Sequence, residues 1–158
     1  MPISGVSTDY SNRKKDIHIF QGVNPSALAI ITPEFGKISN YCTGIQKLVQ
    51  RYAISLLTEL GSQDNYPDFG SSLITRLIRR GGNMNRLDIY PIFNSANLKI
   101  ITSFREYQRA TPGLPDDEQL STAQLTNVIV AGGNVSLSIQ IYPLSGGAVE
   151  FVLPIPSN

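Results

Sequence analysis

The chain has 158 residues, of which 41% are hydrophobic, and this is enough to build one domain with a buried core. Its 13 basic and 12 acidic side chains leave a formal net charge of +1, which excludes a global field that would attract nucleic acid or an anionic membrane. A single cysteine, Cys42, and a single histidine, His18, exclude an internal disulfide and a Cys/His metal cluster. We therefore expect no cofactor, no metal, and partners that are recognised by shape and local contacts.

The first 42 residues contain no long periodic element. Residues 1–15 are polar and end in three consecutive cations, so we expect a flexible or extended arm outside a single domain that spans residues 16–158. Residues 16–20 predict a short strand with His18 half-exposed, and residues 21–42 alternate turn signals with apolar pieces that can form one or two more. There is no basic-then-apolar leader, and the apolar runs are far shorter than the roughly 18 residues of a membrane span.

The most regular segment is residues 45–60, where apolar side chains recur with helical spacing. They form one face: Ile45, Leu48, Val49, Tyr52, Ala53, Leu56, Leu57 and Leu60. The opposite face is polar: Lys47, Gln50, Arg51, Ser55, Thr58 and Glu59. Thr43 is the expected N-cap and Gly61 the expected stop, so this helix should form the main wall of the core. Ile54 lies on the polar side, either as an isolated surface side chain or as a contact with a partner chain.

The loop after this helix has the composition of a rigid corner. Pro67 fixes its own φ angle, and Gly70 can adopt a positive φ. Asp68, Ser71 or Ser72 can cap a following helix. We therefore expect a structural corner built from six residues: Gly61, Pro67, Asp68, Phe69, Gly70 and Leu73.

A short second helix is expected from Leu73 to a stop at residues 81–82, which are both glycine. It carries most of a basic cluster: Arg76, Arg79, Arg80 and Arg86. One interpretation is a solvated face that is partly neutralised by the acidic residues 116–118. The other is a partner-binding surface that meets an acidic neighbour through bidentate Arg–carboxylate contacts.

The remaining sequence predicts a third helix and a sheet. The helix should begin at Asn94 or Ser95 and run to Arg109, followed by a loop over residues 111–121. Residues 125–131 and 135–142 read as a β-hairpin with one apolar face, and residues 148–153 as a last strand. We therefore predict an α+β fold, in which about three helices pack on an antiparallel sheet formed mainly by C-terminal strands.

The edges of this sheet carry few of the charges that natural proteins use to block strand addition. Two segments stand out as candidate partner-binding residues: Asn127, Val128, Ile129 and Val130 in the hairpin, and Val149, Glu150 and Phe151 in the last strand. Glu150 is the only charged residue among them. We expect one edge to accept an extended strand from a partner by β-augmentation.

No constellation in the sequence supports catalysis. Glycoside hydrolysis needs two placed carboxylates, one of them desolvated, and the candidate pair is Glu59 with Asp68. We place Glu59 on the solvated face of the main helix, where its carboxylate stays ionised and cannot act as the acid. His18 and Cys42 lie in separate irregular segments, and no nucleophile elbow or phosphate-binding glycine motif is present. We expect no catalytic residues.

The helix end and the corner together resemble a known signature. Residues 56–61 read Leu-Leu-Thr-Glu-Leu-Gly, and residues 67–73 read Pro-Asp-Phe-Gly-Ser-Ser-Leu. This pattern resembles the baseplate wedge family of contractile phage tails, often labelled lysozyme-like and shared with type VI secretion baseplates. The resemblance is strongest over residues 34–77. It departs at Ser62, Gln63 and Tyr66, where the family carries Glu and Arg.

The resemblance implies a structural subunit that links the baseplate to the first sheath ring and accepts sheath strands. It implies tail sheath and other wedge proteins as partners within a large symmetric hetero-oligomer. The expected location is a virion tail assembled in the host cytoplasm, or the bacterial cytoplasm for a secretion baseplate. The alternatives are a tail-associated peptidoglycan hydrolase and another assembly or adaptor role.

Overall fold

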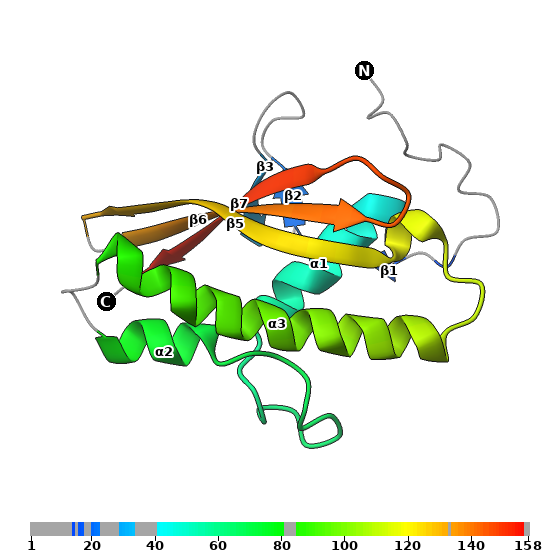
Figure 1. Ribbon diagram of the computed structural model, residues 1–158, viewed down its shortest axis with the longest axis horizontal. Helices are drawn as coiled ribbons and strands as arrows, with labels where there is room; N and C mark the ends of the chain where they lie inside the picture. The colour runs from blue at the N-terminus through cyan, green and yellow to red at the C-terminus, as the bar shows by residue number, and fades with distance from the viewer. Residues whose placement is uncertain are drawn as a thin grey trace.

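The computed structural model describes Lys14 and residues 16–17, 20–22, 29–33, 41–80, 85–132 and 134–156. In this part three helices, α1 (Gly44–Leu57), α2 (Leu73–Arg80) and α3 (Arg86–Ala110), share one hydrophobic core with a sheet. The α+β class is therefore confirmed. α3 runs along the sheet, and α2 lies on the side of α3 away from it (Figure 1). Except for Lys14, the predicted arm lies outside the described residues.

The main sheet has the strand order β2-β3-β7-β6-β5. Its C-terminal strands β5 (Leu120–Ala131), β6 (Asn134–Pro143) and β7 (Val149–Pro156) are antiparallel, as predicted. β3 (Ala29–Pro33) is parallel to β7, and β2 (Phe20–Gly22) is antiparallel to β3. β1 (Asp16–Ile17) and β4 (Tyr41–Cys42) form a separate pair. His18 and Ile19 lie outside the described residues.

The β5–β6 hairpin follows from the alternation of its residues. The four side chains predicted on one face of β6 are all buried: Val135, Leu137, Ile139 and Ile141. Val128 lies opposite Leu137 and Val130 opposite Val135, so Ala131 and Asn134 flank a two-residue turn. The other face of β6 is less exposed to solvent than predicted, because Ser138 is also buried.

β7 is longer than the predicted strand. The sequence indicates an end before Pro154, because proline lacks a backbone donor. The strand instead continues to Pro156, with Pro154 in register opposite Ser136. A proline is compatible with a strand when its missing N–H faces away from the ladder that persists. Pro154 and Pro156 are two residues apart, so their backbone nitrogens face the same side of β7. Both therefore leave the ladder with β6 intact and remove N–H donors from the opposite edge of β7.

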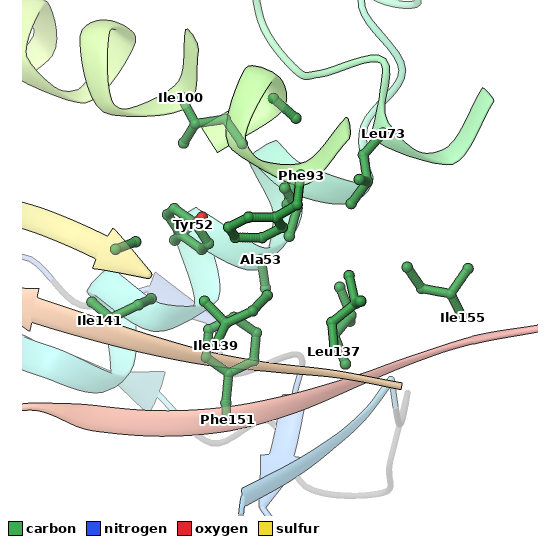
Figure 2. Packing of buried hydrophobic residues seen from close by; sticks show 14 of the residues in the cluster. Tyr52, Ala53, Leu73, Phe93, Ile100, Leu137, Ile139, Ile141, Phe151 and Ile155 are labelled. Carbon is green, nitrogen blue, oxygen red and sulfur yellow. The ribbon is translucent and has the colours of Figure 1, made fainter. Parts of the chain in front are cut away.

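The core lies between α1, α3 and one face of the sheet (Figure 2). Tyr52 has no exposed surface, and its ring meets the ring of Phe151 edge-on at a centroid distance of 6.2 Å. The Tyr52 hydroxyl donates to Asn97 Oδ1 at 2.7 Å, and Asn97 Nδ2 donates to the Ala123 carbonyl at 2.8 Å. Burial raises the pKa of Tyr52 far above its usual range. Two hydrogen bonds thus join α1, α3 and β5 inside the core.

α1 is more deeply buried than its pattern predicts. Gln50 and Ser55, both assigned to the polar face, are only 2% and 5% exposed. Ser55 is compatible with burial because its hydroxyl donates to the Arg51 carbonyl at 2.8 Å. Ile54 packs against the core and is not an isolated surface side chain. A helical pattern ranks the faces of a helix by polarity, but it does not reveal what covers them.

The predicted start of the third helix, at Asn94 or Ser95, is wrong. α3 begins at residue 86 with a capping box that involves both Asn85 and Asp88. Asn85 Oδ1 accepts from the Leu87 N–H at 3.2 Å, and Asp88 Oδ2 accepts from the Asn85 N–H at 3.2 Å. These two bonds satisfy donors that the first helical turn otherwise leaves unpaired.

α3 also contains Pro91, which ordinarily interrupts a helix. Proline at this position removes the hydrogen bond to the Leu87 carbonyl, four residues earlier. Leu87 and Pro91 are both exposed, so water can donate a hydrogen bond to the Leu87 carbonyl. After α3, the predicted loop contains the short helix η2 (Asp116–Glu118) and ends earlier than expected, because β5 begins at Leu120.

Candidate functional site: the corner, the arginines and the sheet edges

The corner after α1 is closed by backbone hydrogen bonds. The Ser71 N–H donates to the Thr58 carbonyl at 2.8 Å, and the Leu60 N–H donates to the Ser71 carbonyl at 3.0 Å. The Gly61 N–H donates to the Pro67 carbonyl at 3.1 Å. The chain therefore leaves α1, makes a compact excursion and returns to the same point before α2 begins.

Gly70 is the tightest point of this corner. Its φ is +101°, and a Cβ atom there would lie 2.5 Å from the Thr58 carbonyl oxygen. Gly61 also has a positive φ, +78°, but a Cβ atom at Gly61 would meet no heavy atom within 4 Å. Leu73 is fully buried, while Asp68 is exposed. The identity of Gly70 is therefore dictated by contact as well as by backbone conformation.

The residues that depart from the family pattern lie on the surface of the corner. Ser62, Gln63 and Tyr66 are all exposed, and Tyr66 retains 69% of its accessible surface. Phe69 is half-buried. The backbone closure involves Gly61, Pro67 and Ser71, and it does not use the three departing side chains.

Glu59 does not lie on the solvated face of the main helix, so that prediction is wrong. α1 ends at Leu57, and Glu59 forms an isolated bridge with Ser71 in the corner. Glu59 Oε2 is buried and has no hydrogen-bond partner among the described residues. Asp68 is exposed, so the two carboxylates do not form a desolvated pair of the kind that a glycosidase needs.

The arginine cluster is largely engaged with the chain's own groups. Arg76 Nη1 donates to Ser95 Oγ at 3.2 Å, and Arg86 Nη2 donates to Asn127 Oδ1 at 3.2 Å. Arg80 Nη1 lies 3.3 Å from Asp88 Oδ1, and both of these side chains are exposed. Arg79 is exposed and makes no hydrogen bond or ion pair with any residue that the structure describes.

Glu118, one of the acidic residues expected to neutralise part of this cluster, pairs with Lys47 instead, while the four exposed arginines still fit a solvated face. Glu118 is only 4% exposed, and its Oε1 accepts from the Gly44 N–H at the start of α1 at 3.1 Å. Its Oε2 lies 2.8 Å from Lys47 Nζ. Glu118 therefore caps α1 from outside the helix, while Thr43 makes no side-chain cap bond.

β7 is not a free edge, so the partner-binding role predicted for its residues fails at that edge. Phe151 is fully buried and lies opposite Ala29 of β3. Beyond Val152, Pro154 and Pro156 lack the donors that a further ladder would need. Glu150 is exposed and accepts a hydrogen bond from Thr126 Oγ1 at 3.0 Å. Val149, at the start of the strand, is half-buried.

β5 is the edge strand on the other side of the sheet, because among the described residues it pairs only with β6. Side chains of α3 occupy part of this edge. The Gln108 amide accepts from the Leu120 N–H at 2.9 Å and donates to the Leu120 carbonyl at 3.3 Å, as a neighbouring strand would. Asn97 donates to the Ala123 carbonyl. Sequence reasoning missed both amides, although a polar residue within an apolar helix face is a usable signal.

The part of β5 nearest the turn is more open. The Val128 N–H donates to Oδ1 of the preceding residue, Asn127, at 2.9 Å, so this outward-facing donor is already paired. Ile129 and Val130 are 54% and 41% exposed. Because Ala131 and Asn134 close the two-residue turn, the N–H and carbonyl of Val130 point away from β6. The most exposed part of the β5 edge is therefore its end near the turn, at Ile129 and Val130.

Cys42 lacks the features of a catalytic nucleophile. Its side chain is 1% exposed, and burial together with the Asp16 carboxylate raises the pKa of the thiol to about 11. A thiol with such a pKa holds its proton at neutral pH, and the thiolate is the reactive form. His18 lies outside the described residues.

Within the described residues, no three His, Cys, Asp or Glu side chains gather in a way that could hold a metal ion. No helix in the same part of the chain has the length and apolar character that crossing a membrane requires. The sequence matches no family model and no curated protein. The geometry of the corner, the arginines and the β5 edge therefore carries the functional argument.

Proposed function

We propose that this chain is a structural subunit of a contractile-tail baseplate wedge, which links the baseplate to the first sheath ring and starts sheath assembly. The observation that carries the proposal is the corner. The motif that resembles the wedge family coincides with a site where Gly70 touches the Thr58 backbone, so the motif has a geometric reason in this chain. In this role its partners are tail sheath and other wedge proteins in a symmetric hetero-oligomer, in a virion or a secretion baseplate.

The sheath-accepting surface in this proposal is the open end of β5. A sheath strand would pair with the outward N–H and carbonyl of Val130, with the exposed side chain of Ile129 beside it. Amides of α3 already bond to Leu120 and to the Ala123 carbonyl on the β5 edge, and β7 pairs with β3. The sheath strand would therefore form a short ladder near the β5–β6 turn.

A proline substitution tests this surface. Val130→Pro removes the outward N–H while leaving the ladder bonds of Ile129 and Ala131 in place, so we expect loss of docking to the cognate sheath protein with a folded monomer. Val130→Ala keeps the N–H and should dock like the wild type. Docking is measured by co-sedimentation and cryo-EM of assembled particles. Undiminished docking of Val130→Pro, or equal loss in both variants, would contradict the proposed surface.

Peptidoglycan hydrolysis is the second candidate, and the buried, unpartnered Glu59 Oε2 is the observation that favours it. We rank it below the structural role because Asp68, the other carboxylate of the pair, is exposed. We expect the purified chain not to clear a peptidoglycan suspension. Clearing by the wild type that is lost in Glu59→Gln would establish the hydrolase.

A further inference from the structure

Two surface depressions lie between α2 and α3. The first, of about 100 Å³, is lined by Leu60, Ser71, Ser72, Arg76, Ser95, Ala96 and Lys99. The second, of about 330 Å³, is lined by Arg76, Arg79, Arg80 and Ile92. Arg76 lines both depressions, so they are neighbours along the α2–α3 seam, and we call the two together the α2–α3 groove.

The groove follows the seam of two antiparallel helices. Arg76 contacts Ser95, and Arg80, further along α2, contacts Asp88, which lies earlier in α3. Ser72, Arg76 and Arg80 are spaced four residues apart, so they lie on one line along α2. At 1.5 Å per residue this line is about 12 Å long. On α3, Lys99 and Ile92 lie toward opposite ends of the same seam.

The charged side chains that line the groove are all cationic. It contains four cations, Arg76, Arg79, Arg80 and Lys99, and no carboxylate. Asp88 contacts the lining through its ion pair with Arg80, which is exposed on both sides and therefore weak. The hydroxyls of Ser72 and Ser95 add small hydrogen-bonding groups. Such a lining recognises oxyanions through charge-assisted hydrogen bonds.

The walls of the groove also have apolar surface. Leu60 and Ala96 line the first depression, and Ile92 lines the second. Apolar surface beside separate cations fits the side chains of a peptide better than a continuous sugar–phosphate backbone. The net charge of +1 for the whole chain also provides little of the attraction that dominates nucleic-acid binding.

We propose that the α2–α3 groove binds an extended acidic segment of a neighbouring protein, with one carboxylate between Arg76 and Lys99 and a second beside Arg79. Arg79 lies three residues, about 4.5 Å, beyond Arg76 on α2. Lys99 lies four residues, about 6 Å, beyond Ser95, the partner of Arg76, and in the opposite direction along the seam. A carboxylate midway between Arg76 and Lys99 is therefore about 8 Å from Arg79 along the groove. Alternate residues of an extended chain are about 7 Å apart, so the expected motif is two acidic residues separated by one other. This site lies apart from the β5 edge, and it does not depend on the baseplate assignment (Figure 1).

The test uses the purified full chain and a fluorescein-labelled octapeptide of alternating glutamate and serine. We expect saturable binding by fluorescence anisotropy, and none with the same peptide carrying glutamine in place of glutamate. Arg76→Gln combined with Lys99→Gln should weaken the Kd at least about tenfold, because two charge-assisted contacts are lost. The control, Arg105→Gln with Arg109→Gln, removes the same charge from exposed positions of α3 outside the groove and should change the Kd less than about twofold.

A second measurement on the wild type keeps the test independent of variant folding. Titration with the peptide should shift the backbone amide resonances near Ser72, Ser95 and Lys99 and leave those of β6 unchanged. No binding at about 1 mM peptide, equal weakening in the two double variants, or shifts spread over the whole surface would each overturn the proposal. Tighter binding of an eight-nucleotide oligothymidylate than of the peptide would overturn the choice of a protein segment as the occupant.

Discussion

At the scale of single residues, Gly70 and Gly61 show that a positive φ alone does not measure how strictly a glycine is required. Both adopt the conformation that side chains disfavour, with φ of +101° and +78°. Only Gly70 faces backbone at a distance no Cβ atom tolerates, 2.5 Å from the Thr58 carbonyl oxygen. That oxygen also accepts the Ser71 N–H, so it cannot move without opening the corner.

Gly70→Ala should therefore destabilise the protein much more than Gly61→Ala. We expect a loss of about 3 kcal/mol in the free energy of unfolding for Gly70→Ala, from backbone strain and overlap together, and about 1 kcal/mol for Gly61→Ala from backbone strain alone. Urea denaturation of both variants measures the difference. Equal losses would mean that the corner relaxes around the new methyl group.

Cys42 gives a prediction for the pH dependence of stability. Burial and Asp16 raise the pKa of its thiol from 9.0 to about 11. Between these values the unfolded chain has released the thiol proton and the folded chain still holds it, so the free energy of unfolding falls as pH rises from about 9 to 11. Below pH 9 both states hold the proton and this contribution is constant.

Cys42→Ala should remove this part of the alkaline loss. Under reducing conditions, we expect the wild type to lose more stability between pH 8 and pH 10.5 than the variant loses, although the variant starts lower because a buried side chain is truncated. Tyr52 titrates in both proteins and cancels in the comparison. Urea denaturation at the two pH values measures these losses. An equal loss of stability in the wild type and in Cys42→Ala would contradict the predicted role of the thiol.

At the scale of elements, the start of α1 depends on a residue far away in the sequence. Thr43 occupies the N-cap position without a side-chain bond, and Glu118 supplies an acceptor to the Gly44 N–H from η2. The same carboxylate pairs with Lys47 at 2.8 Å, where the two side chains are 4% and 12% exposed. A negative charge at this end is favoured by the helix dipole as well as by the ion pair.

Glu118→Gln should be costly because it leaves the Lys47 ammonium buried without its counter-ion. We expect a loss of about 3 kcal/mol in the free energy of unfolding. Asp116→Asn is the matched control in the same short helix: Asp116 is exposed, so its change should stay within about 0.5 kcal/mol. Thermal melts and urea titrations of both variants measure the gap, and a similar small effect for both would show that the pair is not coupled to α1.

At the scale of the whole molecule, the helices and the sheet are joined by one buried polar chain from Tyr52 through Asn97 to Ala123. Each member satisfies a group that would otherwise be unpaired in an apolar core. The same Asn97 amide also occupies part of the β5 edge. Asn97 therefore contributes to the core and, together with Gln108, covers part of the β5 edge.

Tyr52→Phe should cost about 1–3 kcal/mol in the free energy of unfolding, because Asn97 Oδ1 stays buried without its donor. Tyr142→Phe is the control: it also removes a hydroxyl that donates to an amide oxygen, that of Gln140 at 2.8 Å, but at a half-exposed position where water replaces the bond. Its loss should be below about 0.5 kcal/mol. Chemical denaturation compares the two variants. Equal losses would show that the buried hydrogen bond from Tyr52 to Asn97 contributes no more to stability than the half-exposed one.

The sequence by itself determined the features that depend on neighbouring residues. The position of α2, the register face of β6 and the closed corner follow from helical spacing, strict alternation and glycine placement, which act within a few residues. The arginine cluster and the absence of charges near Ile129 were also visible in the sequence. Their consequences for partners stay predictions until the binding experiments are made.

Only the tertiary structure decided which surfaces are free. Tertiary packing placed β3 beside Phe151, put Glu118 at the start of α1 and joined Arg76 and Lys99 in one groove, because each of these contacts joins residues far apart in the chain. It also tolerated Pro91 inside α3, because the carbonyl that loses its partner faces water. Local patterns carry no information about such distant neighbours, whereas burial and long-range hydrogen bonds are properties of the packed molecule.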